Sequence, residues 1–484
     1  MSEQSNPASD MSAPTAPVPI APTLCVIGAS PGGLAVALGA VALGAKVVLV
    51  EKGKLGIERV AAGDVPVKAL IGAARRAEAL RTSGPFGIKP PKANGGEFHE
   101  VNDHVRRVTE AVAPGETKER LTALGVQIVE GEARFKDAAT VVAGDIEIKA
   151  QHFVIALPSV PALPAIEGLE QTPYLTSDSI FEMRVRPKHL IVIGAGATGL
   201  ELAQAFRRLG SDVTLLDQAQ PLADEDAECA GIVVDALARE GVTIRTRVNI
   251  ARVRRFRSKI EVTLTGEHGE EVLEGSDLLI ATGRRHDFST LNLDAAGIGL
   301  NTDGIAVDHR CRTSNKQVYA IGGFTPHLAE HQAASILRHV LLGETVNASA
   351  EPVPRLVLTE PELAHVGLTD VQMALRRRPF RVLRWPYNDN VRAQAERQTA
   401  GQIKAIVDKK GKILGVTIVG AAAGEQIVPW TLAIREGLDV RAFAGIVVPY
   451  SSYTEIGKRA ALGFSGLRLT ASGARRVLRW LGLG

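Results

Sequence analysis

The feature that most constrains this chain is a local pattern that occurs twice. A short apolar stretch leads into a glycine-rich turn, then a helix-forming stretch of small residues, then a second apolar stretch that ends at an acidic residue. The first copy begins at residues 24–27 and the second at residues 189–193. Alternating buried strands and helices are satisfied by a parallel sheet with helices on its faces. The pattern therefore predicts an α/β fold with two related domains.

The first glycine turn reads Gly28-Ala-Ser-Pro-Gly-Gly33, and Glu51 follows 23 residues after Gly28. This order and spacing are typical of a Rossmann-like dinucleotide-binding unit. The first glycine permits the tight turn, and the last lets the helix pack closely on the strand. The helix N-terminus then binds a pyrophosphate, and the acid accepts hydrogen bonds from a ribose. Ser30 replaces the middle glycine, at the point where the backbone comes nearest to the phosphates.

The second turn is complete, because Gly194, Gly196 and Gly199 all stand at the expected positions. Asp217 closes this copy, again 23 residues after the first glycine. Two such units in one chain are stronger evidence than either alone, and they predict two bound dinucleotides. Residues 218–220 contain no Lys or Arg that would hold a 2′-phosphate, which favours NAD over NADP in the second site.

Composition excludes several other classes of protein. The 484 residues are 45% hydrophobic and carry a net charge of +3, so a large core is possible and nucleic-acid binding is not indicated. The cysteines Cys25, Cys229 and Cys311 form no CxxC pair, which excludes a disulfide scaffold and a cysteine zinc site. His327 and His331 have a spacing that can hold a metal on a helix, but no recognisable ligand set accompanies them. We predict no metal site.

The two ends of the chain differ from the rest. Residues 1–20 are rich in Ser, Pro and Ala and are predicted to be a disordered tail. No charged residue stands between Asp10 and Lys46, but no Lys or Arg precedes this run, unlike in a signal peptide, so we expect a cytoplasmic protein. Residues 467–484 form a basic segment with Trp and Leu side chains. Two interpretations of this segment remain open, weak contact with an anionic membrane surface and a frayed tail.

Further motifs extend the pattern over most of the chain, and together they resemble the class I pyridine nucleotide–disulfide oxidoreductases, the family of dihydrolipoamide dehydrogenase and mercuric reductase. The resemblance covers about residues 22–465. Its motifs after the first turn are VPVKAL (65–70), YLTSDSIFE (174–182), GAGATGLELA (194–203), LLIATGRR (278–285), VYAIGG (318–323), LTEPELAHVGLT (358–369), NDNVRAQAE (388–396), GQIKAIVD (401–408), ILGVTIVGAAAGEQI (413–427) and PYSSYTEIGKRAA (449–461).

The resemblance implies a domain order and cofactors. It places FAD in the first nucleotide site and NAD(P)H in the second, and it implies a homodimer built by a C-terminal α+β dimerisation domain. The expected segments are an FAD-binding domain in two parts (21–155 and 278–350), an NAD-binding domain (156–277), the dimerisation domain (351–466) and the basic tail (467–484).

The resemblance also implies which residues bind the cofactors. Lys68 and Glu201 are expected to form an ion pair beside the flavin on its nicotinamide side, where they would stabilise negative charge. The alternative is that Lys68 merely starts a helix and Glu201 faces water. The further cofactor-binding residues expected from the family register are Lys52, Ala133, Gly322, Gly323 and Gly283.

The redox cysteines of the family are missing from this chain. Counted back from Lys68, their two positions hold Arg59 and Asp64. Three interpretations remain open for this pair on the acceptor side of the flavin. It is an ion pair that replaces the disulfide as a clip, or Arg59 binds an anionic acceptor or steadies anionic flavin, or the pair is exposed and contributes almost nothing.

The family's catalytic histidine is missing as well. Its position, five residues before the matching Glu455, holds Tyr450. Both residues are expected to come from the partner subunit. A tyrosine can donate a hydrogen bond to a quinone or anion, but its usual pKa of about 10 makes it a poor base near neutral pH. The alternative is an aromatic side chain at the dimer seam.

Other departures concern FAD. Ala156-Leu157-Pro158 stands where a threonine–glycine turn is expected, and Gly323 replaces the aspartate that usually binds the ribityl chain. Two hypotheses follow. The first is an FAD-dependent oxidoreductase that passes hydride from NADH through flavin directly to a small acceptor such as a quinone, dye, metal ion or oxygen; nicotinamide nucleotide transhydrogenase is a variant of it. The second is a non-catalytic dinucleotide-binding homologue that acts as a sensor or partner protein.

Overall fold

The computed structural model describes residues 19–61, 63–90, 97–266, 269–302, 304–349 and 352–469. Nearly all of the predicted N-terminal tail and of the basic C-terminal segment lies outside these residues. The chain divides into two compact units, which are described separately. The first unit comprises the residues up to Leu55, Glu116–Ser159 and His286–Ala348, and the second comprises Gly56–Gly115, Val160–Arg285 and the residues from Ser349 onward.

A five-stranded parallel sheet forms the centre of the first unit, with the strand order β20-β7-β1-β2-β3. Its strands are β1 (Leu24–Ile27), β2 (Val47–Glu51), β3 (Gln127–Glu130), β7 (His152–Ile155) and β20 (Val318–Ala320). The central strand β1 is buried along its whole length because both faces of the sheet are covered.

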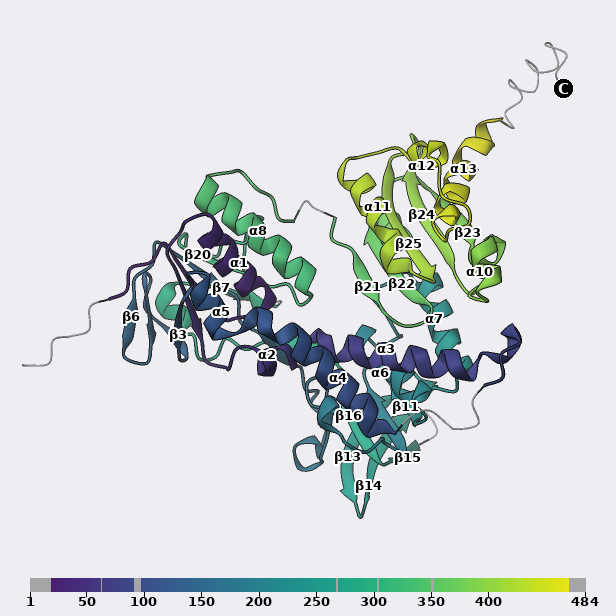
Figure 1. Ribbon diagram of the computed structural model, residues 1–484, viewed down its shortest axis with the longest axis horizontal. Coiled ribbons are helices and arrows are strands. Elements are labelled where there is room, and N and C mark those ends of the chain that lie inside the picture. Colours follow the sequence, from purple (N-terminus) through teal and green to yellow (C-terminus); the bar gives the residue numbers. More distant parts are fainter. Residues whose placement is uncertain are drawn as a thin grey trace, which may run out of the picture. The chain divides into compact units, whose positions relative to one another are not determined.

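Helices cover one face of this sheet and a small antiparallel sheet covers the other. Leu24 and Val26 point into the core beneath α1 (Pro31–Ala42) and α8 (Pro326–Leu342), which lie side by side in Figure 1. Cys25 and Ile27 point into the opposite core, which they share with residues of the β4-β5-β6 sheet. This alternation follows from the two-residue period of a strand. The remaining elements of the unit are β4 (Ala133–Asp137), β5 (Thr140–Ala143), β6 (Ile146–Ile148), α5 (Lys118–Ala123), β18 (Leu300–Asn301) and β19 (Gly304–Ile305).

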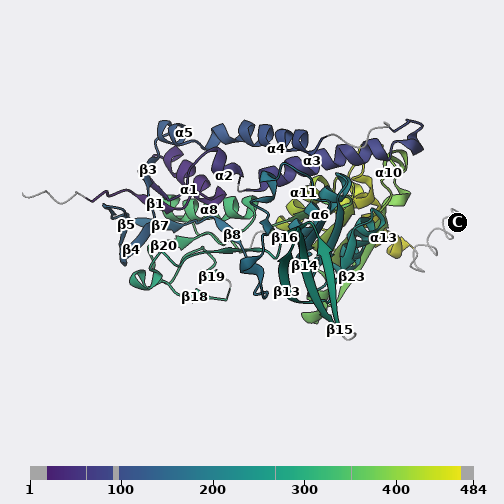
Figure 2. The ribbon, with the colours of Figure 1, turned by 90° about the horizontal axis from the view of Figure 1, so that it is seen from below.

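The second unit contains its own five-stranded parallel sheet, with the order β12-β11-β10-β16-β9. Beside it lies the antiparallel sheet β13-β14-β15, whose strands are seen together in Figure 2. The elements of this region are β9 (Leu175–Thr176), β10 (His189–Ile193), α6 (Ala197–Arg208), β11 (Asp212–Leu216), α7 (Ala227–Arg239), β12 (Thr243–Arg245), β13 (Asn249–Phe256), β14 (Lys259–Gly266), β15 (Gly269–Gly275) and β16 (Asp277–Ile280).

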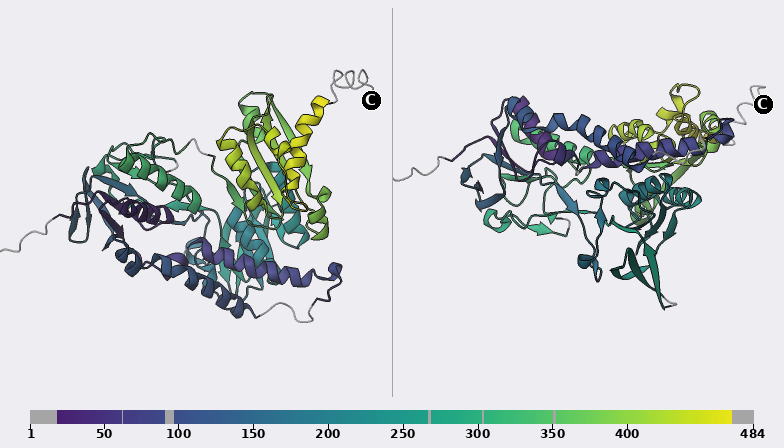
Figure 3. Two further views of the ribbon diagram at one scale, coloured as in Figure 1. Left: turned by 45° about the horizontal axis from the view of Figure 1, so that its top comes forward. Right: turned by 60° about the horizontal axis from the view of Figure 1, so that its bottom comes forward.

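Three helices lie near the start of the second unit, and the first two of them carry Arg59 and Asp64, the residues expected at the family's cysteine positions. The three helices are α2 (Ile57–Ala61), α3 (Asp64–Arg81) and α4 (Phe98–Val112), and α3 runs alongside α4 in both views of Figure 3. Helix α3 also packs against α6. Buried side chains of α3 such as Leu70 and Ile71 share one core with Leu200 and Phe206 of α6.

The C-terminal part of the second unit is a five-stranded antiparallel sheet with helices against it. The strand order is β21-β22-β25-β24-β23. Trp430 of α11 stacks on Phe443 of α12, with ring centroids 3.7 Å apart, in the core of this region. The elements are β21 (Arg355–Val357), β22 (Glu362–Gly367), α9 (Asp370–Leu375), β23 (Phe380–Pro386), α10 (Val391–Ala395), β24 (Gln402–Asp408), β25 (Ile413–Gly420), α11 (Ala423–Arg435), α12 (Arg441–Gly445) and α13 (Glu455–Leu469).

The predicted fold class is confirmed, since two parallel sheets flanked by helices are followed by an α+β region. Strands β8 (Ser159–Pro161) and β17 (Arg284–His286) pair with each other in the segments that lead from one unit to the other. In the described part of the chain, no helix has both the length and the apolar character that a membrane span requires.

Candidate functional site

The first glycine turn follows β1 in the first unit, and its backbone requires glycine at two positions. Gly28 has φ +100°, and a β-carbon there would lie 2.5 Å from the carbonyl oxygen of Ala156. A β-carbon on Gly33 would lie 2.1 Å from the carbonyl oxygen of Gly28. The tight turn and the close packing of α1 on β1 therefore both depend on the absence of a side chain.

Ser30 is accommodated because its position needs no unusual backbone conformation. It is the N-cap of α1, with φ −62° and ψ 167°, and its Oγ accepts a hydrogen bond from the Gly33 amide at 3.3 Å. Serine is a favoured N-cap residue because its oxygen satisfies one of the amide groups left open at a helix start. The side chain folds back onto the helix, so the serine is compatible with the turn.

Glu51 ties the end of β2 to the turn. Its Oε2 accepts a hydrogen bond from the Ala29 amide at 2.6 Å, and its Oε1 accepts one from the Gly53 amide at 2.8 Å. The neighbouring Lys52 forms an exposed ion pair with Glu132 at 3.1 Å. Ala133 is buried at the start of β4. All of these residues belong to the first unit.

The second unit repeats this arrangement after β10. Gly194 has φ +112°, and β-carbons on Gly194 and Gly199 would lie 2.4 Å and 1.9 Å from backbone oxygens. A β-carbon on Gly196 would meet nothing within 4 Å, which leaves the space over the start of α6 open for a ligand. Asp217 accepts hydrogen bonds from the amides of Ala195 (2.6 Å) and Ala219 (2.7 Å), as Glu51 does in the first unit.

The residues present fit a dinucleotide in each unit. The glycine turn, the open amides at the start of a helix and the acid at the end of the next strand are the features that bind pyrophosphate and ribose. In the second unit, Gly283 follows β16 at the same sheet edge, with φ +106° and open space around its α-carbon. In the first unit, the end of β20 leads to Gly322 and Gly323.

The sequence pattern missed a cation near Asp217. The Gln220 carboxamide, oriented with its oxygen toward Arg247, accepts hydrogen bonds from that guanidinium at 2.6 and 2.9 Å. Arg247 lies two residues beyond β12, whose Arg245 is the register partner of Leu216. Because Arg247 is 30 residues from Asp217 in sequence, only the strand pairing brings it there. The Arg247 guanidinium is therefore already hydrogen-bonded to Gln220.

Lys68 and Glu201 are in contact, as the ion-pair interpretation requires. The Lys68 Nζ of α3 lies 3.1 Å from the Glu201 Oε2 of α6. The carboxylate is buried, with a side chain 3% exposed, whereas the lysine side chain is 43% exposed. Glu201 Oε1 also accepts a hydrogen bond from the Leu358 amide at 2.8 Å. Glu201 thus connects α3, α6 and the segment that follows β21.

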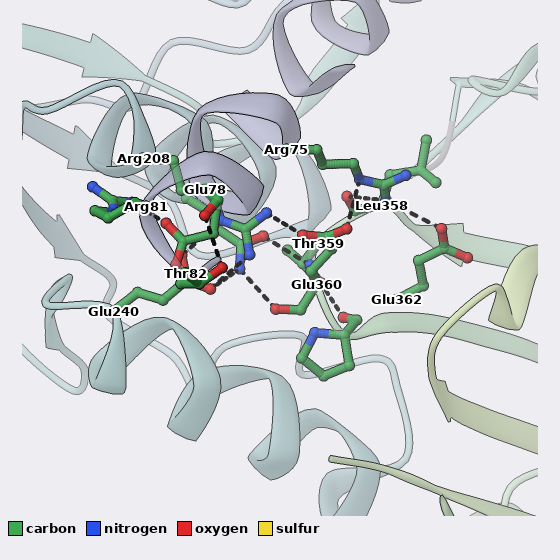
Figure 4. Close-up of polar contacts among 12 residues, drawn as sticks. Arg75, Glu78, Arg81, Thr82, Arg208, Glu240, Leu358, Thr359, Glu360 and Glu362 are labelled. Atoms are coloured by element: carbon green, nitrogen blue, oxygen red, sulfur yellow. Dashed lines mark hydrogen bonds and ion pairs between the residues drawn. The ribbon is translucent and has the colours of Figure 1, made fainter. Parts of the chain in front are cut away.

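A second layer of charges lies two helical turns further along the same two helices (Figure 4). Arg75 of α3 contacts Glu360 at 3.3 Å and Glu362 at 3.1 Å. Arg208 of α6 forms a bidentate pair with Glu240, at 2.7 and 2.8 Å, and also contacts Glu360. Lys68 and Arg75 are seven residues apart, as are Glu201 and Arg208. The two layers therefore fix the alignment of α3 with α6 beside the Lys68–Glu201 pair.

Arg208 stays ionised inside this cluster. Burial by itself lowers the pKa of the guanidinium, but hydrogen bonds and charges from Glu240 and Glu360 outweigh burial and raise the pKa. Gln204 completes the cluster, because its side chain exchanges two hydrogen bonds of 2.8 Å with the backbone of Glu360. Nothing in the spacing of Arg75 and Arg208 alone indicated this role, since Glu360, the partner that they share, lies over 150 residues from both.

The two residues in the cysteine positions lie on consecutive helices. Arg59 is half-buried on α2, and Asp64 is exposed as the first residue of α3. Tyr450 is 79% exposed in a loop before α13. Glu455, the first residue of α13, accepts hydrogen bonds from Arg459 at 2.9 and 3.2 Å. The structure therefore gives Glu455 an arginine as its partner.

No redox-active thiol pair is available among the described residues. Cys25, Cys229 and Cys311 are all buried and reduced. Burial raises the pKa of the Cys311 thiol to about 11 and raises that of the other two thiols further. Nor do the described residues include a group of three or more His, Cys, Asp or Glu side chains placed to hold a metal ion.

Comparison with known proteins agrees with this arrangement. The family model for pyridine nucleotide-disulphide oxidoreductases matches residues 22–348, and the model for the dimerisation domain of that family matches residues 353–461. Mercuric reductase from Streptomyces lividans is 32% identical over 463 residues, covering 91% of this chain and 96% of that protein. Dihydrolipoyl dehydrogenase from Geobacillus stearothermophilus is 32% identical over 451 residues, covering 90% of this chain and 94% of that protein.

A solved structure shows the same fold. LpdA from Mycobacterium tuberculosis superposes with a TM-score of 0.81 at 25% sequence identity, covering 93% of this chain and 100% of that chain. The resemblance read from the motifs is confirmed, and a homodimer fits the presence of the dimerisation domain. The chain belongs to the pyridine nucleotide-disulphide oxidoreductases, a family of oxidoreductases, and carries Arg59 and Asp64 where we expected the family's cysteine pair.

Proposed function

We propose that this protein is a flavin-dependent NADH oxidoreductase that passes hydride equivalents directly to a small acceptor. The observation that carries the proposal is the combination of two dinucleotide turns with the absence of a usable thiol pair. Both turns keep the glycines that their geometry needs. All three cysteines are buried in separate places with raised pKa values. Electrons then have no dithiol to pass through.

The Lys68–Glu201 pair supports a redox function. The buried carboxylate holds the lysine in place, while 43% of the lysine side chain remains accessible. A positioned ammonium group stabilises negative charge that develops next to it, and it does so more strongly in a site that excludes water. FAD, when bound, supplies the two-electron acceptor. Lys68 stabilises the developing negative charge, and Glu201 positions Lys68. Separately, Asp217 favours NADH over NADPH.

Arg59 supports direct transfer to an acceptor that carries negative charge or gains it on reduction. In the family register it stands on the side of the flavin opposite to the nicotinamide. A guanidinium there suits a quinone or another acceptor that gains negative charge on reduction. We expect Arg59→Ala to retain FAD and to be reduced by NADH at the normal rate, with slower reoxidation by the acceptor. Unchanged turnover with every acceptor tested would exclude this role for Arg59.

The test of the proposed function is an anaerobic titration with NADH, followed by the visible spectrum. We expect a yellow protein whose flavin absorbance is lost after about one equivalent of NADH per FAD, since only the flavin accepts electrons. A requirement for about two equivalents would reveal a second two-electron group and contradict the proposal. A colourless protein that binds NADH but cannot be loaded with FAD would favour the sensor or partner role instead.

A further inference from the structure

The turn that follows β20 in the first unit lies at the sheet edge where a dinucleotide would bind. Strand β20 pairs in parallel with β7, and β7 pairs in parallel with β1. The carboxyl ends of these strands therefore lie at one edge of the sheet, where α/β proteins bind their ligands. Gly28 follows β1 at this edge, and Gly322-Gly323 follows β20.

Position 323 has no room for a side chain. A β-carbon on Gly323 would lie 2.8 Å from Leu328 Cγ, 2.9 Å from the Ala329 amide nitrogen and 3.2 Å from Gln332 Oε1. The first turn of α8 thus stands against this glycine. An aspartate at position 323 would push the start of α8 away. The turn therefore packs directly against α8 only because residue 323 is a glycine.

Gln332 occupies the polar position beside this turn. Its Oε1 accepts a hydrogen bond from the Gly323 amide at 3.0 Å. The side chain is half-buried, and the described residues provide no acceptor for its Nε2. A carboxamide nitrogen carries two donors, and Gln332 Nε2 is not among the described buried side-chain atoms that lack a partner, so it is open to solvent. The orientation of the oxygen toward Gly323 leaves the nitrogen available to a ligand.

Aromatic stacking holds the residue that follows the turn. Phe324, which follows Gly323, stacks on His286 with ring centroids 4.8 Å apart and an interplanar angle of 15°. Phe288 continues the stack at 5.7 Å from His286. The hydrogen bond from Gly323 to Gln332 and the stacking of the next residue, Phe324, both restrain the backbone of this turn. A fixed turn positions the Gln332 carboxamide without further rearrangement.

We propose that Gln332 is a ligand-binding residue whose Nε2 donates a hydrogen bond to a hydroxyl or carbonyl oxygen of FAD. This inference rests on the proposed function. The carboxamide supplies the polar contact that position 323 cannot supply, from α8 instead of from the turn. Unlike an aspartate, this carboxamide brings no negative charge to that edge of the sheet.

The experiment measures FAD affinity by reconstituting the apoprotein and following the quenching of flavin fluorescence. Gln332→Met keeps the length of the side chain and removes the donors, and we expect FAD to bind about 3- to 10-fold more weakly, as the loss of one hydrogen bond implies. Glu330→Ala, an exposed position on the same helix, serves as the control and should leave the affinity unchanged. Equal affinities for Gln332→Met and the unaltered protein would overturn the inference.

A second variant tests whether the turn can still accept an aspartate at position 323. Gly323→Asp should lower both FAD affinity and the melting temperature, because its β-carbon meets α8 at less than 3 Å. Tighter FAD binding by Gly323→Asp would also overturn the inference. If the unaltered protein cannot be loaded with FAD at all, the proposed function and this inference both fail. If it binds FAD and Gln332→Met binds equally well, only the inference fails.

Discussion

Single residues account for the way this chain keeps its nucleotide turns while departing from their usual sequence. Ser30 replaces a glycine, but its extended backbone and its N-cap hydrogen bond to Gly33 make the serine compatible with the turn. Gly28 and Gly33 have no such freedom, because any side chain there would strike the backbone. The middle position is therefore the one of the three that tolerates a side chain.

At the same scale, we predict that the thiols take no part in turnover. Burial raises the pKa of Cys311 to about 11, so this thiol stays protonated near neutral pH. A thiol reagent such as Ellman's reagent should find no rapidly reacting thiol in the native protein and three after unfolding. Replacement of Cys25, Cys229 and Cys311 by alanine should leave NADH turnover in place. Inhibition by a dithiol-specific arsenical would contradict this prediction.

Pairs of elements explain why Lys68 and Glu201 meet. Helices α3 and α6 are held together by an apolar core and by two layers of charge, the Lys68–Glu201 pair and the Arg75–Glu360–Arg208 cluster (Figure 4). Arg208 is buried, and its carboxylate partners come from the end of α7 and the segment before β22. A cluster of this kind stabilises one alignment of its helices, because a shift of either helix would leave a buried charge without its partner.

We predict that removing the central cation of this cluster is strongly destabilising. Arg208→Met keeps the length of the side chain but leaves Glu240 and Glu360 without their buried cation. The free energy of unfolding should fall by about 3–5 kcal/mol, measured by urea denaturation. The control is Arg338→Met, which breaks an exposed pair with Glu344 and should cost less than about 1 kcal/mol. Similar losses in the two variants would show that the cluster is unimportant.

At the scale of the whole molecule, the second unit is joined internally by buried charges as well as by apolar contacts. Lys404 of β24 contacts Asp226 at 2.6 Å, Asp370 at 2.7 Å and Glu228 at 3.3 Å. Arg384 of β23 adds a hydrogen bond of 2.9 Å to Glu228. These contacts join the helix α7 of the nucleotide-binding region to the antiparallel sheet. The stability of the unit should therefore depend on pH.

The direction of that dependence follows from Glu228. Hydrogen bonds, first from Arg384 and then from Gln402, together with nearby positive charges, lower the pKa of Glu228 from 4.5 to about 2. A carboxyl whose pKa is lower in the folded state stabilises the fold above pH 4.5, and this contribution is lost as the pH falls from 4.5 to about 2. We expect acid to weaken the second unit across this range.

The matched variants are Arg384→Gln and Arg378→Gln, which make the same charge change at a paired and an exposed position. Arg384→Gln should lower the urea midpoint more than Arg378→Gln at neutral pH. The difference between the variants should shrink as the pH falls from 4.5 toward 2, because Glu228 is protonated in the unfolded chain over this range and its lowered pKa in the fold then stabilises the fold less. A difference that is constant from neutral pH to pH 3 would be inconsistent with this assignment.

The sequence by itself determined the fold class and the two dinucleotide turns, whereas the placing of Arg59 and Asp64 at the family's cysteine positions is implied by the resemblance. The fold class and the turns rest on local features, because a glycine turn, a strand period and an acid 23 residues on can all be read from neighbouring positions. Lys68 and Glu201 are 133 residues apart, and their pairing was expected only through the family resemblance. The assignment of residues to the domains, and the roles of Arg59, Asp64 and Tyr450, remain predictions.

Only the tertiary structure decided which side chains meet across long sequence separations. Strand pairing places Arg247 beside Gln220, the packing of α3 on α6 joins Arg75 and Arg208 through Glu360, and the closure of the turn after β20 onto α8 places Gln332 at Gly323. The physical reason is that each of these contacts depends on how whole elements are aligned. That alignment is set by the burial of apolar faces. The same apolar faces can pack in the same way with many different polar residues around them, so the polar contacts cannot be read from the apolar pattern.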